Sequence, residues 1–252
     1  MKCDKIPYIH DPVIHNKQAA YEVVPLLMDI FAPRTVIDVG CGTGTWLSVF
    51  KEKGVSSSLG IDGNYIDTKL LQIDIQDFLA VDLRRSFSIQ RKFDLVISLE
   101  VAEHLPSESA NAFIESLTNL GNVIIFSAAI PEQGGQNHIN EQWPNYWEEK
   151  FRLSGFIPVD ILRFKIWQNT AVEWWYRQNI LIYIRQGTLE LQECKPKAVV
   201  HPELFTLKCE EVKLLQNRID LLKDELTQLK QNPSFVFSIK LLIKSILKFI
   251  KP

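Results

Sequence analysis

A short apolar run followed at once by three alternating glycines is the feature that most constrains this fold. Residues 35–39 read TVIDV, a β-branched run that predicts a buried parallel strand. Gly40, Gly42 and Gly44 follow, and a helical pattern begins at Trp46. Because glycine has no Cβ, a ligand can lie directly against the backbone of such a turn. The stretch therefore predicts a nucleotide-binding corner between a strand and a helix.

The spacing of the glycines differs from two common phosphate-binding motifs. A dinucleotide fingerprint would have glycine where this chain has Thr45, and the Gly-Lys-Ser/Thr ending of a P-loop is absent. Asp38 stands in the strand end, where a carboxylate would repel a pyrophosphate but would suit a cationic amino-acid ligand. The alternative interpretation is a tight turn of an unrelated α/β domain.

Composition sets the class of protein. The chain has 252 residues, of which 46% are hydrophobic and 23% charged, and this is enough for one sizeable core. The net charge of −2 argues against a domain that binds nucleic acid. Its 4 cysteines are scattered, which indicates reduced thiols in a cytoplasmic protein. The N-terminus has no apolar segment typical of a signal peptide.

Periodicity predicts an α/β order of elements around this corner. Residues 1–17 are expected to form a polar arm that either stays solvated or folds over the ligand, and they include His15. The apolar spacing predicts helices at 18–31 and 143–153, and further strands at 57–61, 78–81, 93–99, 122–127, 158–162 and 179–184.

Acidic residues follow the second and third predicted strands. Asp62 comes after residues 57–61, where a carboxylate can accept hydrogen bonds from ribose hydroxyls. Asp82 follows residues 78–81, where it could accept the amine of adenine while Leu83 covers the ring.

In this order, the motifs resemble those of class I S-adenosylmethionine-dependent methyltransferases over residues 18–185. The resemblance rests on VIDVGCGTG at 36–44, Asp62, Asp82-Leu83 and FDLVIS at 93–98. It implies a Rossmann-like α/β fold, with a seven-stranded, mostly parallel sheet and helices on both faces. It also implies that S-adenosyl-L-methionine lies across the carboxyl edge. The cofactor-binding residues would be Asp38, Gly40, Cys41, Gly42, Gly44, Asp62, Asp82, Leu83 and Glu100.

The fourth predicted strand runs into the sequence EVAEHLP. If residues 100–104 form a helical turn, Glu100, Glu103 and His104 share one face. Two carboxylates and one imidazole suit Mg²⁺, Mn²⁺ or Fe²⁺ better than a closed zinc site. The long loop after the fifth strand adds His138 at the same edge of the sheet.

Glu-x-x-Glu-His with a downstream histidine resembles small-RNA 3′-end 2′-O-methyltransferases, which bind a divalent metal through these four residues. Carried over, the metal ligands would be Glu100, Glu103, His104 and His138. The Glu-His pair also resembles ubiquinone-biosynthesis O-methyltransferases. The rest of the loop is more similar to bacterial methyltransferases found with cell-surface polysaccharide genes. The alternative is a site without metal, in which His104 is the general base; Glu103, His138 and His15 complete the candidate catalytic residues.

Aromatic residues are concentrated in two later stretches. Residues 143–153 carry four of them at helical spacing, which favours core packing over a stacking platform for substrate. The segment 166–179 is also unusually aromatic, and there packing and binding of a sugar or base are equally compatible with the sequence.

The methyltransferase domain is expected to end near residue 187, followed by a linker at 188–203. Within 204–231 the spacing becomes heptad-like, with a stripe at 212–229 that predicts either a coiled-coil homodimer or a helix packed on the body. Residues 234–252 carry lysines on an otherwise apolar pattern, which predicts a basic helix at the inner face of the membrane or a docking helix.

Together these features predict a methyltransferase that uses S-adenosyl-L-methionine on a hydroxyl of a glycan, lipid-linked sugar or small-molecule acceptor. The second hypothesis is metal-dependent RNA 2′-O-methylation, against which the near-neutral charge argues. The third is a catalytically silent scaffold that dimerises through its heptad helix. A hydroxyl nucleophile requires a base or a metal to remove its proton, which the histidines and glutamates could supply.

Overall fold

The computed structural model describes residues 16–231, 233, 237–238 and 240–243. The chain divides into two compact units, Met1–His201 and Pro202–Pro252, which are treated separately below. His15 and the rest of the N-terminal arm lie outside the described residues, as does most of the segment where the basic helix is expected.

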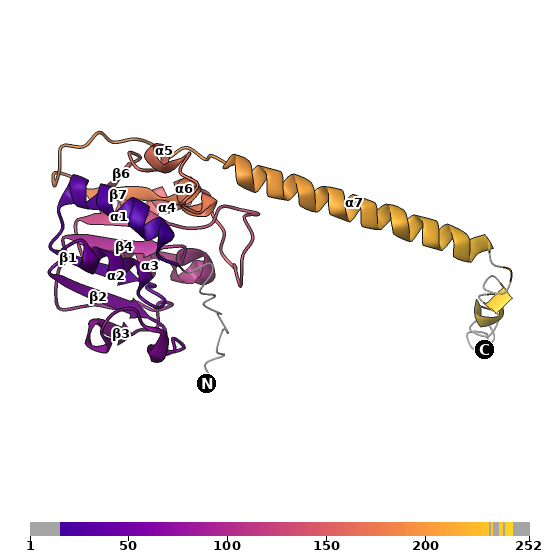
Figure 1. Cartoon of the computed structure of the whole chain (residues 1–252), viewed down its shortest axis with the longest axis horizontal. Coiled ribbons are helices and arrows are strands. Elements are labelled where there is room, and N and C mark those ends of the chain that lie inside the picture. Colours follow the sequence, from indigo (N-terminus) through magenta and orange to yellow (C-terminus); the bar gives the residue numbers. More distant parts are fainter. Residues whose placement is uncertain (1–15, 232, 234–236, 239, 244–252) are drawn as a thin grey trace. The chain divides into compact units, whose positions relative to one another are not determined.

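The first unit is built on one seven-stranded sheet, as predicted (Figure 1). Its strands lie in the order β3-β2-β1-β4-β5-β7-β6, and only β7 runs antiparallel to its neighbours. The strands are β1 (Thr35–Val39), β2 (Ser57–Asp62), β3 (Phe78–Ala80), β4 (Leu95–Leu99), β5 (Val123–Ser127), β6 (Phe156–Val159) and β7 (Leu181–Arg185). Since β1, β2, β4 and β5 are parallel, the loops after them meet at one edge.

Helices cover both faces of this sheet (Figure 1). Successive strand residues point to opposite faces, so Val36 belongs to the core under α1 and α2, whereas Ile37 belongs to the core under α3 and α4. The α-helices of this unit are α1 (Gln18–Phe31), α2 (Thr45–Glu52), α3 (Ala110–Thr118), α4 (Pro144–Leu153), α5 (Arg163–Ile166) and α6 (Trp174–Asn179). Short 3₁₀ turns are η1 (Thr68–Leu70), η2 (Ile75–Asp77), η3 (Ala102–His104) and η4 (Ser107–Ser109).

The last two strands have other bounds than predicted: β6 is Phe156–Val159 instead of 158–162, and β7 is Leu181–Arg185 instead of 179–184. β6 ends at Val159, because Asp160 turns out of the strand to form an ion pair with the fully buried Arg163. β7 begins only at Leu181, because the N–H of Ile180 still donates a helical hydrogen bond to the carbonyl of Tyr176. Asn179, predicted to start the strand, is therefore the last residue of α6.

The segment before the second unit is tied to the first unit by hydrogen bonds. The N–H of Cys194 donates to the carbonyl of Pro158, and Arg163 donates to the carbonyl of Lys197. The N–H of His201 donates to the side chain of Gln178 at 2.8 Å. Residues 194–201 of the expected linker are thus part of the first unit.

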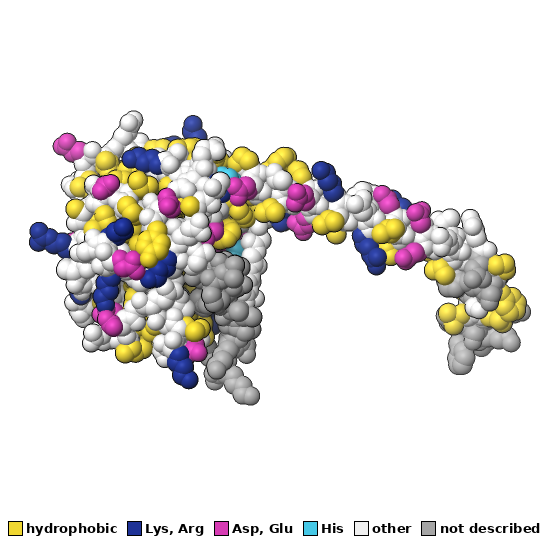
Figure 2. All heavy atoms as spheres, viewed as in Figure 1, with side chains coloured by type: hydrophobic (Ala, Val, Ile, Leu, Met, Phe, Trp, Pro, Cys, Tyr) yellow, Lys and Arg dark blue, Asp and Glu magenta, His cyan; other side chains and the backbone are white. Residues whose placement is uncertain are grey.

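The second unit contains α7 (Pro202–Gln231), a single helix of 30 residues, which confirms the predicted helical extension. Hydrophobic and charged side chains are interspersed along its surface (Figure 2). No helix among the described residues has an apolar stretch of the length that a membrane crossing requires.

Candidate active site

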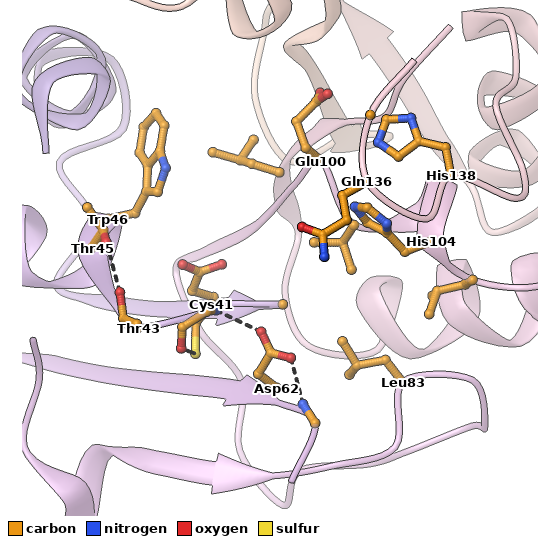
Figure 3. A pocket seen from close by; sticks show the side chains of 18 of the residues that line it. Cys41, Thr43, Thr45, Trp46, Asp62, Leu83, Glu100, His104, Gln136 and His138 are labelled. Carbon is orange, nitrogen blue, oxygen red and sulfur yellow. Dashed lines mark hydrogen bonds between the residues drawn. The ribbon is translucent and has the colours of Figure 1, made fainter. Parts of the chain in front are cut away.

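A cavity of about 900 Å³ lies where the parallel strands end. Its lining combines the glycine turn after β1, Asp62 at the end of β2, and the segment that follows β4. Figure 3 shows Cys41 and Asp62 on one side of this space, and His104 and His138 close together on another. The cavity therefore joins the predicted cofactor residues to the predicted catalytic residues.

The glycine turn requires glycine for two physical reasons. Gly40, Gly42 and Gly44 have φ values of 86°, 54° and 82°, in the left-handed region that side chains disfavour. A Cβ on Gly40 would also lie 2.3 Å from Cγ2 of Val101, the residue that follows Glu100. The turn after β1 and the turn after β4 thus pack directly against each other.

The carboxylate of Asp62 links the glycine turn after β1 to the loop after β2. It accepts hydrogen bonds from the N–H of Gly42 at 2.7 Å and from the N–H of Gly63 at 2.6 Å (Figure 3). It also accepts one from the hydroxyl of Tyr65 at 2.6 Å. The side chain is buried but lines the cavity. These bonds hold the carboxylate in one orientation where a ribose would be expected.

Asp38 and Cys41 form the floor of the cavity. Both are buried, and burial together with the charge of Asp62 raises the pKa of Asp38 well above its usual range. Burial also raises the pKa of the Cys41 thiol, so the thiol is neutral and its role is packing. A cationic group of a ligand would favour the ionised form of Asp38.

Asp82 and Leu83 line the cavity as predicted, but Asp82 already has a strong partner. Arg84 donates to both of its carboxylate oxygens, at 2.9 and 3.0 Å, and this pairing lowers the pKa of Asp82. An adenine amine would therefore share this carboxylate with Arg84. Leu83 is buried and offers an apolar surface for a ring.

The segment after β4 differs from the helical turn that the sequence predicted. The 3₁₀ turn η3 starts only at Ala102, and Glu100 has φ 54°, a left-handed conformation that is uncommon for a residue with a side chain. The chain bends sharply here because Val101 must pack on Gly40. The i, i+3 and i+4 geometry expected for Glu100 is therefore wrong.

Glu100 is instead held by buried amides. Gln133 donates to Oε2 at 3.0 Å, and Asn179 donates to Oε1 at 3.1 Å. Gln178, next to Asn179, donates to Gln133 at 3.1 Å. Burial raises the pKa of Glu100, and these amide donors act against that rise. Sequence analysis missed all three amides, since they lie 33 to 79 positions from Glu100 and form no motif.

Glu103, His104 and His138 form the cluster that could hold a metal ion. One ligand atom from each lies within 4.8 Å of the others. The centroids of the two imidazole rings are 4.8 Å apart, and the ring planes are nearly perpendicular (Figure 3). Neither carboxylate oxygen of Glu103 has a hydrogen-bond partner among the described residues, although the side chain is fully buried. Glu100, predicted as a fourth ligand, is not part of this cluster.

The loop that carries His138 is fixed in two ways. The carbonyl of Glu103 accepts the N–H groups of Ile139 and Asn140, at 2.9 and 3.0 Å. Nδ1 of His138 lies 2.9 Å from a carboxylate oxygen of Glu141, which the sequence analysis had not singled out. Because a carboxylate accepts, Nδ1 is the donor in this contact, which leaves Nε2 as the ring nitrogen for another partner.

The charge state of Glu103 follows from its surroundings. Burial and the neighbouring charge of Glu100 raise the pKa of Glu103 well above its usual range. An ionised carboxylate that is buried without a donor is costly, so in the absence of a cation burial favours the protonated form. A divalent cation would supply the missing partner, and the donor set of one carboxylate and two imidazoles therefore fits a metal.

Aromatic side chains from α2 and α6 form another wall of the cavity. Trp46 contacts Tyr176 edge to face at a centroid distance of 5.4 Å, and Trp174 and Trp175 also line the cavity. Glu173, just before α6, lines it too, and burial raises its pKa. The aromatic segment that the sequence left undecided thus takes part in the site.

Comparison with known proteins agrees with this geometry. The family model described as "Methyltransferase domain" matches residues 15–159. The chain belongs to this methyltransferase family. A search of curated proteins finds no match.

Solved structures share the fold, and two of the three below are described as methyltransferases. Magnesium protoporphyrin IX methyltransferase from Synechocystis PCC 6803, solved with bound SAM, is 23% identical with a TM-score of 0.50, over 68% of this chain and 80% of that one. DesVI of Streptomyces venezuelae is 14% identical with a TM-score of 0.51, over 67% and 91%. CalS10 from Micromonospora echinaspora, an amino pentose methyltransferase, is 16% identical with a TM-score of 0.50, over 66% and 89%.

Proposed function

We propose that this protein transfers a methyl group from S-adenosylmethionine to a sugar hydroxyl, in a cell-surface glycan or a lipid-linked intermediate. One observation carries the proposal: the glycine turn and Asp62 line the same cavity as His104 and His138, and Glu103 is clustered with these two histidines. Cofactor residues and proton-accepting residues therefore face one space.

The first side of the cavity fits S-adenosylmethionine, which when bound supplies an electrophilic methyl group on a sulfonium. Gly40 and Gly42 expose bare backbone, Asp62 presents an oriented carboxylate for ribose hydroxyls, and Leu83 covers a ring. Asp38 provides a buried carboxylate, and a cationic group of the ligand would favour its ionised form. Placement of the reacting groups by such contacts can lower the barrier by about 7–11 kcal/mol.

The second side supplies the proton acceptor. A hydroxyl becomes a good nucleophile only as it loses its proton, and neutral His138 presents Nε2 as a lone pair because Glu141 holds Nδ1. His104 lies beside it and lines the same cavity. Either imidazole could take the hydroxyl proton as the methyl group is transferred.

As the alternative to a histidine base, we propose that a divalent cation, Mg²⁺ or Mn²⁺, is bound by Glu103, His104 and His138. When bound, it would lower the pKa of an acceptor hydroxyl. The unpartnered carboxylate of Glu103 supports this proposal. At about 100 times its Kd, Mg²⁺ or Mn²⁺ should raise the free energy of unfolding of the wild type by about 2.7 kcal/mol and leave that of Glu103→Gln unchanged. This result would identify the cluster as a metal site.

The choice of a sugar is supported by the aromatic wall and Glu173. Ring faces pack against the C–H faces of sugars, and a carboxylate accepts hydrogen bonds from their hydroxyls. The amino pentose methyltransferase CalS10 has a similar fold, so this fold accommodates a sugar as acceptor.

RNA 2′-O-methylation is the second candidate function. The observation in its favour is the cluster of Glu103, His104 and His138, three of the four ligands that the resemblance to small-RNA methyltransferases implies. The net charge of −2 argues against it, since binding of the phosphate backbone depends on basic side chains.

Transfer of a labelled methyl group to host extracts would distinguish these functions. We expect label in the glycan or lipid fraction with wild type, and none with Glu103→Gln. Label in the RNA fraction would favour the second candidate. Calorimetry with S-adenosylmethionine tests the cofactor separately: we expect binding that Asp62→Ala weakens, and no binding at all would leave only a silent scaffold.

A further inference from the structure

The apolar stripe on α7 carries an inference that does not depend on the proposed activity. Residues at alternating spacings of three and four form this stripe, and each is between 43% and 64% exposed. They are Val212, Leu215, Ile219, Leu222, Leu226 and Leu229. In heptad terms the first, third and fifth are a positions, and the others are d positions.

The flanking charges differ between the two ways in which a second copy can pack on this stripe. In a parallel pair, each g residue faces the e residue five positions later in the partner, which places Glu225 against Lys230 but Arg218 against Lys223. In an antiparallel pair, g residues face g residues, and Arg218 can meet Glu225. The parallel arrangement thus contains a repulsive contact that the antiparallel one avoids.

The apolar layers select one antiparallel register. With Ile219 opposite Leu222 of the second copy, each a residue of the stripe pairs with a d residue, giving six layers. The same register brings Arg218 of each copy near Glu225 of the other copy, so the two-fold axis repeats this contact. Shifting it by one heptad loses layers and brings Glu225 of one helix near a glutamate of the other.

We propose that α7 binds a second copy of this chain as a two-stranded antiparallel coiled coil, with its two-fold axis between Ile219 and Leu222. Both copies then use the same surface, as a closed dimer requires. A separate row on the helix, Leu207, Leu214 and Leu221, falls at c positions and lies outside the seam.

The first experiment measures the mass of the full chain by sedimentation equilibrium. We expect a dimer for wild type and a monomer for Leu222→Glu. Leu221→Glu is the matched control, because it changes the adjacent leucine outside the seam and should leave the dimer intact. A monomeric wild type, or loss of the dimer in Leu221→Glu, would overturn the proposal.

A charge reversal tests the orientation. Arg218→Glu should weaken an antiparallel dimer, by about three- to tenfold in Kd, because it replaces attraction to Glu225 by repulsion. The double variant Arg218→Glu with Glu225→Arg should restore the affinity. In a parallel dimer, Arg218→Glu would instead face Lys223, so a tighter dimer would contradict the antiparallel arrangement.

Spin labels placed on the outer face give an independent measurement. At a rise of about 1.5 Å per residue, labels at Gln231 in the two copies would be about 32 Å apart along the axis, and labels at Asn217 about 10 Å apart. Equal distances at the two positions would identify a parallel dimer and exclude the register proposed.

Discussion

The carboxylates Asp62 and Glu103 have opposite hydrogen-bonding environments: Asp62 lines one side of the cavity, and Glu103 is clustered with His104 and His138, which line the other. Asp62 accepts three hydrogen bonds, from Gly42, Gly63 and Tyr65, whereas Glu103 accepts none from the described residues. Both are buried. The difference shows that the first side is complete before a ligand arrives, and that the second leaves a buried group in need of a partner.

This contrast indicates how the two sides would act. A carboxylate whose orientation is already fixed can receive neutral hydroxyls with little reorganisation. A carboxylate without donors is destabilising when ionised, so it becomes useful only with a proton or a cation. The first side therefore suits recognition, and the second suits chemistry. The predictions below test this division.

Substitutions at Glu103 should have the largest effect. We expect Glu103→Gln to lower turnover by about 10²- to 10⁴-fold, the range for loss of a positioned acid–base or metal-binding group. Binding of S-adenosylmethionine should stay within about twofold, because the other side of the cavity is untouched. Label transfer and calorimetry measure the two quantities. The exposed Glu108→Gln serves as the control, and an equal loss there would remove the special role of Glu103.

Gly40→Ala should damage the recognition side. The new Cβ would lie 2.3 Å from Val101 in a backbone at φ 86°, so strain and overpacking together should lower the free energy of unfolding by about 2–5 kcal/mol. Chemical unfolding measures this loss, and calorimetry should show weaker cofactor binding.

Gly54→Ala separates strain from crowding. Gly54 has φ 96°, but its Cβ would meet no described atom within 4 Å. This variant should lose only about 1–2 kcal/mol and bind the cofactor normally. Equal losses in the two variants would show that the contact with Val101 does not matter.

Asn179→Ala tests the support of Glu100. It removes the donor to Oε1 and leaves a buried carboxylate oxygen unpaired, which should cost about 1–3 kcal/mol of unfolding free energy. Asn169→Ala is the matched control, because Asn169 donates to a carboxylate of Glu22 at an exposed position. There the loss should be below about 1 kcal/mol. If both variants lose the same free energy, burial of the Glu100 network is not what stabilises it.

The smallest effect is expected from pH. The pKa of Asp38 is raised in the folded protein, so the folded state holds this proton more tightly than the unfolded state. This contribution to stability is present below the unfolded pKa and is lost as pH rises through the folded pKa. Asp38→Asn should therefore stabilise the ligand-free protein above that folded pKa, measured by thermal unfolding across pH.

The same substitution should weaken the cofactor. Ionised Asp38 can attract a cationic ligand, so affinity for S-adenosylmethionine should rise as pH increases through the raised pKa. We expect Asp38→Asn to bind about tenfold more weakly above that pKa and to lose most of this pH dependence. A variant that keeps the wild-type pH profile would show that another group is responsible.

The sequence predicted most of the fold, because its strands are short apolar runs with glycines or acidic residues directly after them. The order of strands up to Ser127 and the turn at Gly40 follow from such local patterns. The later boundaries were less accurate. Asp160 and Asn179 were expected in strands, but the ion pair of Asp160 with Arg163 and the last turn of α6, rather than local propensity, place them outside.

The sequence alone determined which side chains reach the cavity edge after β1, β2 and β4, since parallel strands bring their carboxyl ends together. The tertiary structure decided their state. It placed Gln133 and Asn179 on Glu100, set Val101 against Gly40, and left Glu103 beside His104 and His138. These contacts join residues that are far apart in the chain. Burial and hydrogen bonding follow from them and have no local signature in the sequence. They determine which carboxylate favours its charged form.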